Sequence, residues 1–174
     1  TGNQLAFLLA TTALVVGVQR LAVETSPYFL FAPLAPLLVA ALLGTAPGLA
    51  WSAWTALVVG LLVPAAPLQA LIATFVGSVA ASLLVQAGRT RISVALAGLA
   101  GRGIAGVATY ATVLVTGGMS TGEAAAAAGL VIVGGLLAGV VALGLLPVAE
   151  SVFGFLTDFR LLETVPGARE LLEG

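Results

Sequence analysis

The sequence predicts an all-α fold, a polytopic membrane bundle of about six transmembrane helices. Of the 174 residues, 60% are hydrophobic and only 7% are charged, against about a quarter charged in a soluble domain. The mean hydropathy is +1.20. A soluble fold of this length could not bury that much apolar surface, so the excess must face lipid. The apolar residues also fall into six runs, most of them close to the roughly 20 residues that one span requires.

Short polar or Pro- and Gly-containing segments separate the six runs. The first run covers residues 5–18, extends to 23 around Gln19 and Arg20, and stops at Glu24-Thr25-Ser26-Pro27. The other five cover residues 28–43, 49–63, 68–85, 92–116 and 124–146. Their Leu- and Ala-rich composition without period-2 alternation favours helices over strands. We expect the second helix to carry Pro33 and Pro36 in its first turns, and the sixth to close at Pro147.

We divide the chain into a transmembrane bundle, residues 1–149, and an amphipathic connector, residues 150–174, that leaves the membrane on the cytoplasmic side. Apolar side chains recur along the connector at helical spacing: Val152, Phe153, Leu156, Phe159 and Leu162. That pattern is typical of a helix lying along the interface or docking on a partner domain.

The arginines predict the orientation of the bundle. Six spans place both termini on one side, together with Arg89, Arg91, Arg160 and Arg169, whereas the opposite side holds only Arg20, with Glu24 and Glu123. The positive-inside bias therefore predicts that both termini are cytoplasmic. Trp51, Trp54 and Tyr28 lie near the predicted ends of helices, where aromatic side chains anchor membrane proteins at the interface.

The residue types that are missing exclude several function classes. The chain has no Cys and no His, and all six of its cations are Arg. Thiolate chemistry, Walker-type phosphate binding and the usual His ligands or bases are therefore excluded. A net charge of −1 gives no reason to expect nucleic-acid binding. We identify no catalytic, cofactor-binding or metal-ligating residue, which leaves open from this chain alone whether the protein is an enzyme.

Arg102 is the residue that the membrane environment makes most unusual. If the fifth run is one helix, Arg102 lies about 16 Å beyond Arg91, near the bilayer centre. An Arg at that depth costs roughly 3 kcal/mol on insertion scales. Its donors could bind freed backbone carbonyls, the hydroxyls of Thr74 or Ser78, or an anion. We favour snorkelling to the headgroups, or an interfacial course for residues 92–101, over such a functional polar site.

Two glycine patterns suggest close helix packing. Gly101 to Gly106 reads as G-x-G-x-x-G, but the dinucleotide-binding fingerprint requires a preceding strand. Here the string lies inside an apolar helical run, so we interpret it as packing surface. Gly135 and Gly139 form a small-x-x-x-small face on the sixth helix. We expect contacts within the bundle there and keep dimerisation as the alternative.

The stretch from Gly144 to Glu163 resembles one family. It is similar to the G-L-L-P-x-x-E-x-x-F-G-x-x-T-D-x-x-L-L-E segment of seven-transmembrane HD-type receptors, the bacterial cyclic di-AMP phosphodiesterases. The residues that match are Pro147, Glu150, Phe153, Gly154, Thr157, Asp158, Leu161, Leu162 and Glu163. Ser26-Pro27-Tyr28 with Pro33, and Arg91-x-Ser93, match weaker parts of the same pattern.

The resemblance implies a membrane-anchoring and signal-relay domain that is itself non-catalytic. The family joins its last span to a cytoplasmic HD hydrolase domain and carries an extracellular sensor. It therefore implies a location in the bacterial plasma membrane, with Pro147, Glu150, Phe153, Gly154, Thr157, Asp158 and Glu163 as a connector that relays movement. The family has seven spans, and the first span and the sensor would then precede residue 1. HD chemistry needs His ligands, so a chain without His cannot perform it.

Two other function classes remain open. Short helices with internal prolines and an intramembrane Arg also suit a membrane subunit that binds or transports a small solute. A structural subunit of a larger membrane complex is a third reading, and a homo-oligomer is compatible with all three.

Overall fold

The computed structural model describes residues 2–31, 33–87 and 91–153, and this part of the chain is a helical bundle without strands. The helices are α1 (Gly2–Thr25), α2 (Leu34–Leu43), α3 (Thr45–Leu62), α4 (Pro67–Ala87), α5 (Arg91–Thr116) and α6 (Thr121–Phe153). Five are long and apolar enough to cross a membrane, and α2 is a shorter apolar helix of 10 residues. The predicted fold class is confirmed.

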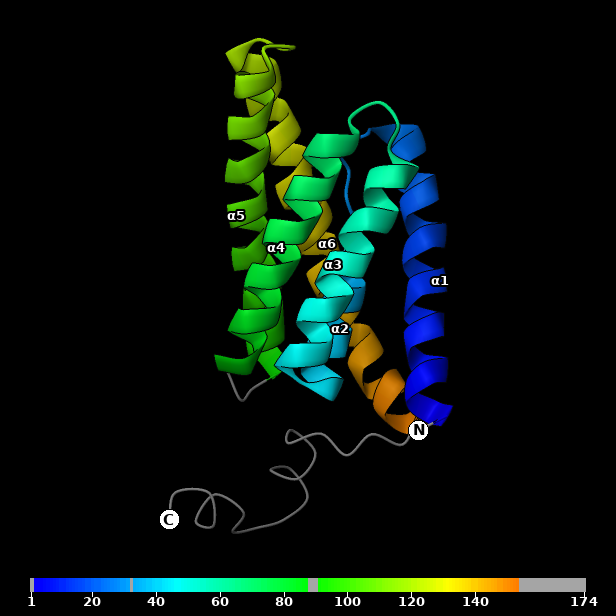
Figure 1. Ribbon diagram of the computed structural model, residues 1–174. Coiled ribbons are helices and arrows are strands. Elements are labelled where there is room, and N and C mark those ends of the chain that lie inside the picture. The colour runs from blue at the N-terminus through cyan, green and yellow to red at the C-terminus, as the bar shows by residue number, and fades with distance from the viewer. Residues whose placement is uncertain (1, 32, 88–90, 154–174) are drawn as a thin grey trace.

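Successive helices run in opposite directions through the bundle (Figure 1). The start of α1 and the end of α6 lie at the same end, as expected if the chain crosses the membrane six times. α3 packs against α4, α4 packs against α5, and α5 packs against α6. α1 is the least buried long helix, with 28% of its apolar window covered against 44% for α4 and α5. α1 is therefore the long helix that the rest of the described chain covers least.

The short helix α2 forms the centre of the core. Its seven residues 34–40 are all buried, and it contacts each of the five other helices. A helix that is apolar on every side is stable only when neighbours surround it. Leu34, Leu37 and Leu38 supply most of the buried volume of this central helix.

The predicted start of the second helix is wrong. Residues 26–31, which we call the nonhelical segment, are not helical, and α2 begins only at Leu34. The physical reason is Pro33, since a helix running through residues 28–37 would place its ring against the carbonyl four residues earlier and would lose one backbone hydrogen bond, which disfavours that helix. Pro33 instead caps α2, and its carbonyl accepts the first helical bond from Leu37 N at 3.0 Å. Only Pro36 lies in the first turn, as predicted.

Two other helix boundaries also differ from the prediction. Residues 45–48 are the first turn of α3 rather than a loop, and the sharp corner is Gly44, whose φ of 97° favours glycine. Pro147 does not close α6, which continues to Phe153. Prolines inside membrane helices are tolerated because neighbouring groups satisfy the freed backbone. α6 includes residues 150–153, and the division into bundle and connector stays a prediction.

Glycines set the closest approach of α4 to α5. A Cβ at Gly101 would lie 2.5 Å from Gly77 O and 2.8 Å from Ala81 Cβ, and a Cβ at Gly77 would lie 2.8 Å from Ala105 Cβ. The G-x-G-x-x-G string is therefore helical packing surface in the structure, without the strand that dinucleotide binding requires. Small residues replace the hydrophobic drive between helices by close van der Waals contact.

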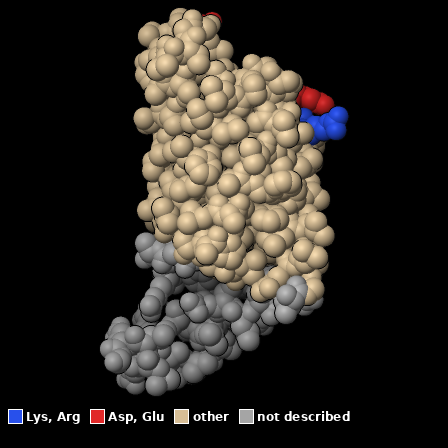
Figure 2. All heavy atoms as spheres, viewed as in Figure 1, with Lys and Arg blue, Asp and Glu red and all other residues tan. Residues whose placement is uncertain are grey.

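Charge is almost absent from the described surface. The face in Figure 2 is uncharged apart from acidic and basic atoms at its edges. At one end of the bundle, the hydroxyl of Tyr28 donates to the sulfur of Met119 at 3.7 Å, which ties the nonhelical segment to the turn before α6. Trp54 is half-exposed on α3. The interfacial anchoring of these aromatic side chains stays a prediction.

Replacing Gly101 by Ala should destabilise the bundle, because the new methyl overlaps the α4 backbone at Gly77 and Ala81. Overpacking of this kind costs about 1–3 kcal/mol. Thermal unfolding in nanodiscs should show a lower midpoint. Gly103→Ala is the matched control, because a Cβ at Gly103 meets nothing within 4 Å. Equal midpoints for the two variants would contradict the packing described here.

Candidate functional site

The nonhelical segment brings unpaired backbone groups into the interior of a membrane bundle. Leu30 is buried at its centre, with 1% of its surface exposed. Its peptide groups have no helical partners, and a polar backbone group left unpaired in a bilayer costs several kcal/mol. Other parts of the protein must therefore supply hydrogen bonds to residues 29–31.

Gln19 of α1 supplies two of these bonds. Its Nε2 donates to Phe29 O at 3.3 Å, and its Oε1 accepts from Phe31 N at 2.9 Å. The side chain is fully buried. One amide thus satisfies a donor and an acceptor that flank Leu30, in the way that a neighbouring strand would.

Arg102 of α5 supplies the third bond. Its Nη2 donates to Leu30 O at 3.1 Å, and only 1% of the residue is exposed. The favoured expectation, that Arg102 snorkels to the headgroups, is therefore wrong. An interfacial course for residues 92–101 is also wrong, because α5 is one continuous helix of 26 residues packed on α4 and α6. A freed backbone carbonyl was among the expected partners, although its position at Leu30 was not foreseen.

Two adjacent glycines of α6 make room for this contact. A Cβ at Gly135 would lie 1.6 Å from Arg102 Cγ, so the arginine stem fills the space that any side chain there would take. A Cβ at Gly134 would lie 2.9 Å from Leu30 O. Gly139, one turn further along, faces Ala95 and Gly98 of α5. Both glycines of the predicted small-residue face are buried and point toward α5 rather than toward lipid.

The hydroxyls considered as partners of Arg102 do not bind it. Thr74 and Ser78 of α4 are completely buried, yet Thr74 Oγ1 and Ser78 Oγ have no hydrogen-bond partner. Arg102 Nε and Nη1 are also buried without a partner. Four buried polar atoms on two neighbouring helices are thus unsatisfied, where most buried polar atoms in proteins are paired.

Acidic residues are far from Arg102 along the helices. Those of the described chain, Glu24, Glu123 and Glu150, lie in the end turns of α1 and α6. Glu123 closes a capping box, in which its Oε2 accepts from Ser120 N at 2.8 Å. Across residues 2–31, 33–87 and 91–153, no three His, Cys, Asp or Glu side chains come together as metal ligands. These residues therefore do not fit the metal site that HD hydrolysis requires.

Part of the predicted connector lies in α6. Pro147, Glu150 and Phe153 occupy its last two turns. Gly154, Thr157, Asp158 and Glu163 lie outside the described residues. A role of these positions in relay stays a prediction.

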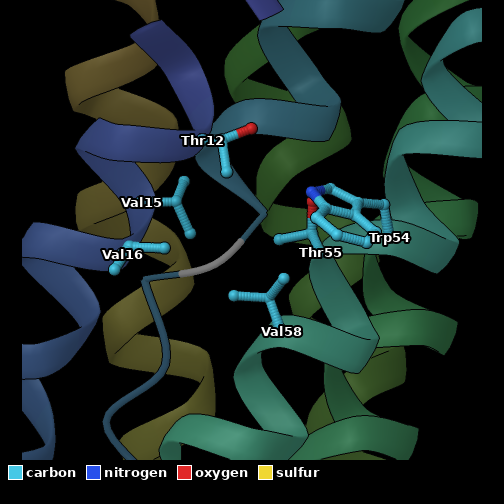
Figure 3. A pocket seen from close by; sticks show the side chains of 6 residues that line it. All are labelled: Thr12, Val15, Val16, Trp54, Thr55 and Val58. Carbon is cyan, nitrogen blue, oxygen red and sulfur yellow. The ribbon is translucent and has the colours of Figure 1, made fainter. Parts of the chain in front are cut away.

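Three cavities in the described bundle are too small or too apolar for a polar solute. Figure 3 shows the first, where Thr12, Val15 and Val16 of α1 face Trp54, Thr55 and Val58 of α3 around about 10 Å³, which is room for about one water. A groove of about 300 Å³ lies between α1, α2 and α6, lined by Phe7, Ala10, Thr11, Leu14, Leu38, Leu145, Val148, Ala149 and Val152. Another of about 390 Å³ lies between α3 and α4. Arg102 lines none of these three.

Sequence reasoning missed Gln19, Leu30 and Gly134. The signal for Gln19 was present, because an amide inside an apolar run is as conspicuous as Arg102 and needs a buried partner. Leu30 carried no signal, since its importance lies in a backbone carbonyl that Arg102 reaches across 72 positions of sequence. Gly134 matters because it leaves room for the backbone of Leu30, and the sequence does not show which helix face meets that segment.

The family profile described as "7TM receptor with intracellular HD hydrolase" matches residues 2–157 of the chain. No curated protein and no solved structure matches it. The profile covers the whole bundle, including the nonhelical segment, Arg102 and the last turns of α6.

Replacing Gln19 by Met should loosen the nonhelical segment. The change keeps the volume but leaves Phe29 O and Phe31 N unpaired, at about 1–3 kcal/mol for each buried group. Maleimide labelling of a Ser26→Cys reporter should become faster, and the unfolding midpoint should fall. Thr12→Val is the control, because Thr12 bonds only within its own helix, to Leu8 O. Unchanged labelling in Gln19→Met would contradict the assigned role.

Replacing Gly135 by Ala should displace the Arg102 stem and break its bond to Leu30. We expect a loss of stability of at least the 1–3 kcal/mol typical of overpacking. Gly144→Ala lies on the same helix and meets nothing within 4 Å, so it should be neutral. If Gly135→Ala is as stable as Gly144→Ala in nanodiscs, the stem of Arg102 does not occupy the space beside Gly135.

Proposed function

The chain belongs to the family of 7TM receptors with an intracellular HD hydrolase, and we propose that within this family it is the non-catalytic membrane anchor and signal-relay domain of a cyclic-dinucleotide phosphodiesterase. The hydrolase domain would follow α6 on the cytoplasmic side, and a sensor would lie on the other side. The substrate that the resemblance implies for that hydrolase is cyclic di-AMP. The bundle itself would perform no chemistry.

The observation that carries the proposal is the length of α6. Its 33 residues span about 50 Å at 1.5 Å per residue, whereas the hydrocarbon core is about 30 Å thick. The helix is therefore long enough to extend past the hydrocarbon core, and because it is continuous to Phe153 it could transmit rotation or translation to whatever follows it. Pro147 lacks the N–H that would bond one turn back, so it is the natural pivot in this rod.

The contacts around Arg102 support coupling between α6 and the rest of the bundle. α6 holds the arginine stem at Gly135 and the backbone of Leu30 at Gly134. A displacement of α6 would thus alter the bond between Arg102 and Leu30, and through Leu30 the two bonds that Gln19 makes. Packed interfaces of this kind move between discrete arrangements rather than deforming continuously.

The arginines support the proposed orientation. Arg91 begins α5 at the end of the bundle where α1 starts and α6 ends. Arg20 lies in the last turns of α1, at the opposite end. With Arg89, Arg160 and Arg169 of the sequence, the basic end would face the cytoplasm of a bacterium, in its plasma membrane.

Insertions into α6 of the full receptor should test the relay through helical phase. One Ala inserted after Val152 turns everything beyond it by about 100°, whereas seven residues restore the phase to within about 20°. We expect the single insertion to abolish the effect of the sensor on cyclic di-AMP hydrolysis in native membranes. The seven-residue insertion should largely restore it.

The control for folding is hydrolysis by the same variants after detergent extraction, which should not depend on phase. Equal regulation after insertions of one and of seven residues would show that α6 is a tether, and the relay proposal would fail. A native protein without an attached hydrolase domain would also overturn it.

A further inference from the structure

The four unsatisfied polar atoms of α4 and α5 lie on one side of the contact between these helices. Gly77 and Gly101 mark that contact, because a Cβ on either would meet the other helix at 3.1 Å or less. Ser78 and Arg102 are the next residues, each turned by about 100° from its glycine. Since α4 and α5 run in opposite directions (Figure 1), both turns lead to the same side. Thr74 lies one turn from Ser78 on the same face of α4.

This side faces the interior of the bundle. Arg102 reaches Leu30 there, and Gly98, one turn before Arg102, meets Leu37 of α2. Thr74, Ser78 and Arg102 are each at most 1% exposed. By this helical geometry the three side chains point toward the same interior region, which is bounded by α4, α5, α2 and the nonhelical segment.

The chemistry of these atoms selects an anion. Arg102 carries a full positive charge and has only N–H donors, and the two hydroxyls can also donate. The single carbonyl at Leu30 does not neutralise the guanidinium, and the acidic residues of the described helices lie in end turns. A buried charge without a counter-charge is strongly unfavourable. We propose that Arg102, Ser78 and Thr74 bind a small inorganic anion of halide type within the membrane.

The site does not depend on the relay function, because a bundle that serves only as an anchor has the same unpaired donors. The test uses the full native protein in nanodiscs of zwitterionic lipid, with chloride replaced by gluconate at constant ionic strength. We expect the unfolding midpoint to rise with chloride and to saturate, since a ligand that binds only the folded state stabilises it.

Variants assign the effect to this site. Ser78→Ala should raise the half-saturating chloride concentration about tenfold, because a hydrogen bond to a charged group is worth that much or more. Ser82→Ala is the matched control, since Ser82 lies one turn away on α4 but pairs with Ser52 at 3.4 Å. Arg102→Gln should abolish the chloride response. If that variant does not fold, the half-saturating chloride concentrations of Ser78→Ala and Ser82→Ala still test the proposal.

Two results would overturn the proposal. Equal midpoints in chloride and gluconate would mean that water alone satisfies these donors. An equal shift in Ser78→Ala and Ser82→Ala would mean that chloride acts elsewhere. Bromide soaked into crystals of the protein supports the site if its anomalous peak lies beside Arg102 and Ser78, and contradicts it if the peaks lie only at the surface.

Discussion

A membrane protein cannot leave backbone N–H and C=O groups unpaired in its interior, and the nonhelical segment places several of them there. Gln19 and Arg102 meet this constraint from opposite sides, by bonding Phe29 O, Phe31 N and Leu30 O. The arrangement allows α2 to start late and to fill the centre of the bundle. The position of one short stretch of backbone thus explains why Gln19 and a donor at position 102 lie inside the bundle.

Glycines give these contacts their room. The arginine stem passes α6 only because position 135 has no side chain, and Leu30 approaches α6 only because position 134 has none. On the other face of α5, Gly101 brings the α4 backbone close. Arg102 therefore belongs to a helix that is tightly held on both sides, which fixes the direction of its side chain. The same close packing makes the contact sensitive to small displacements of α6.

Hydropathy and turn residues were enough to predict the fold class and most helix positions, because five of the helices are long apolar runs. The start of α2 was not predictable from hydropathy, since residues 28–33 are as apolar as a helix would be. Pro33 decided it, through a steric clash that depends on the carbonyl four residues earlier. Arg102 was conspicuous by its depth, whereas its partner was not, because a carbonyl of Leu30 has no sequence signature.

Leu30 O requires a hydrogen-bond donor, but it does not require the positive charge that Arg102 carries. A neutral donor of the same reach would satisfy one carbonyl, and buried ion pairs are often replaced by apolar residues without loss of stability. The structural role therefore accounts for a donor at position 102 but not for a guanidinium with two buried nitrogens left unpaired. The unexplained charge lies at the junction of α5, α6 and the nonhelical segment. Whatever neutralises it there will also set how firmly α6 is held against the rest of the bundle.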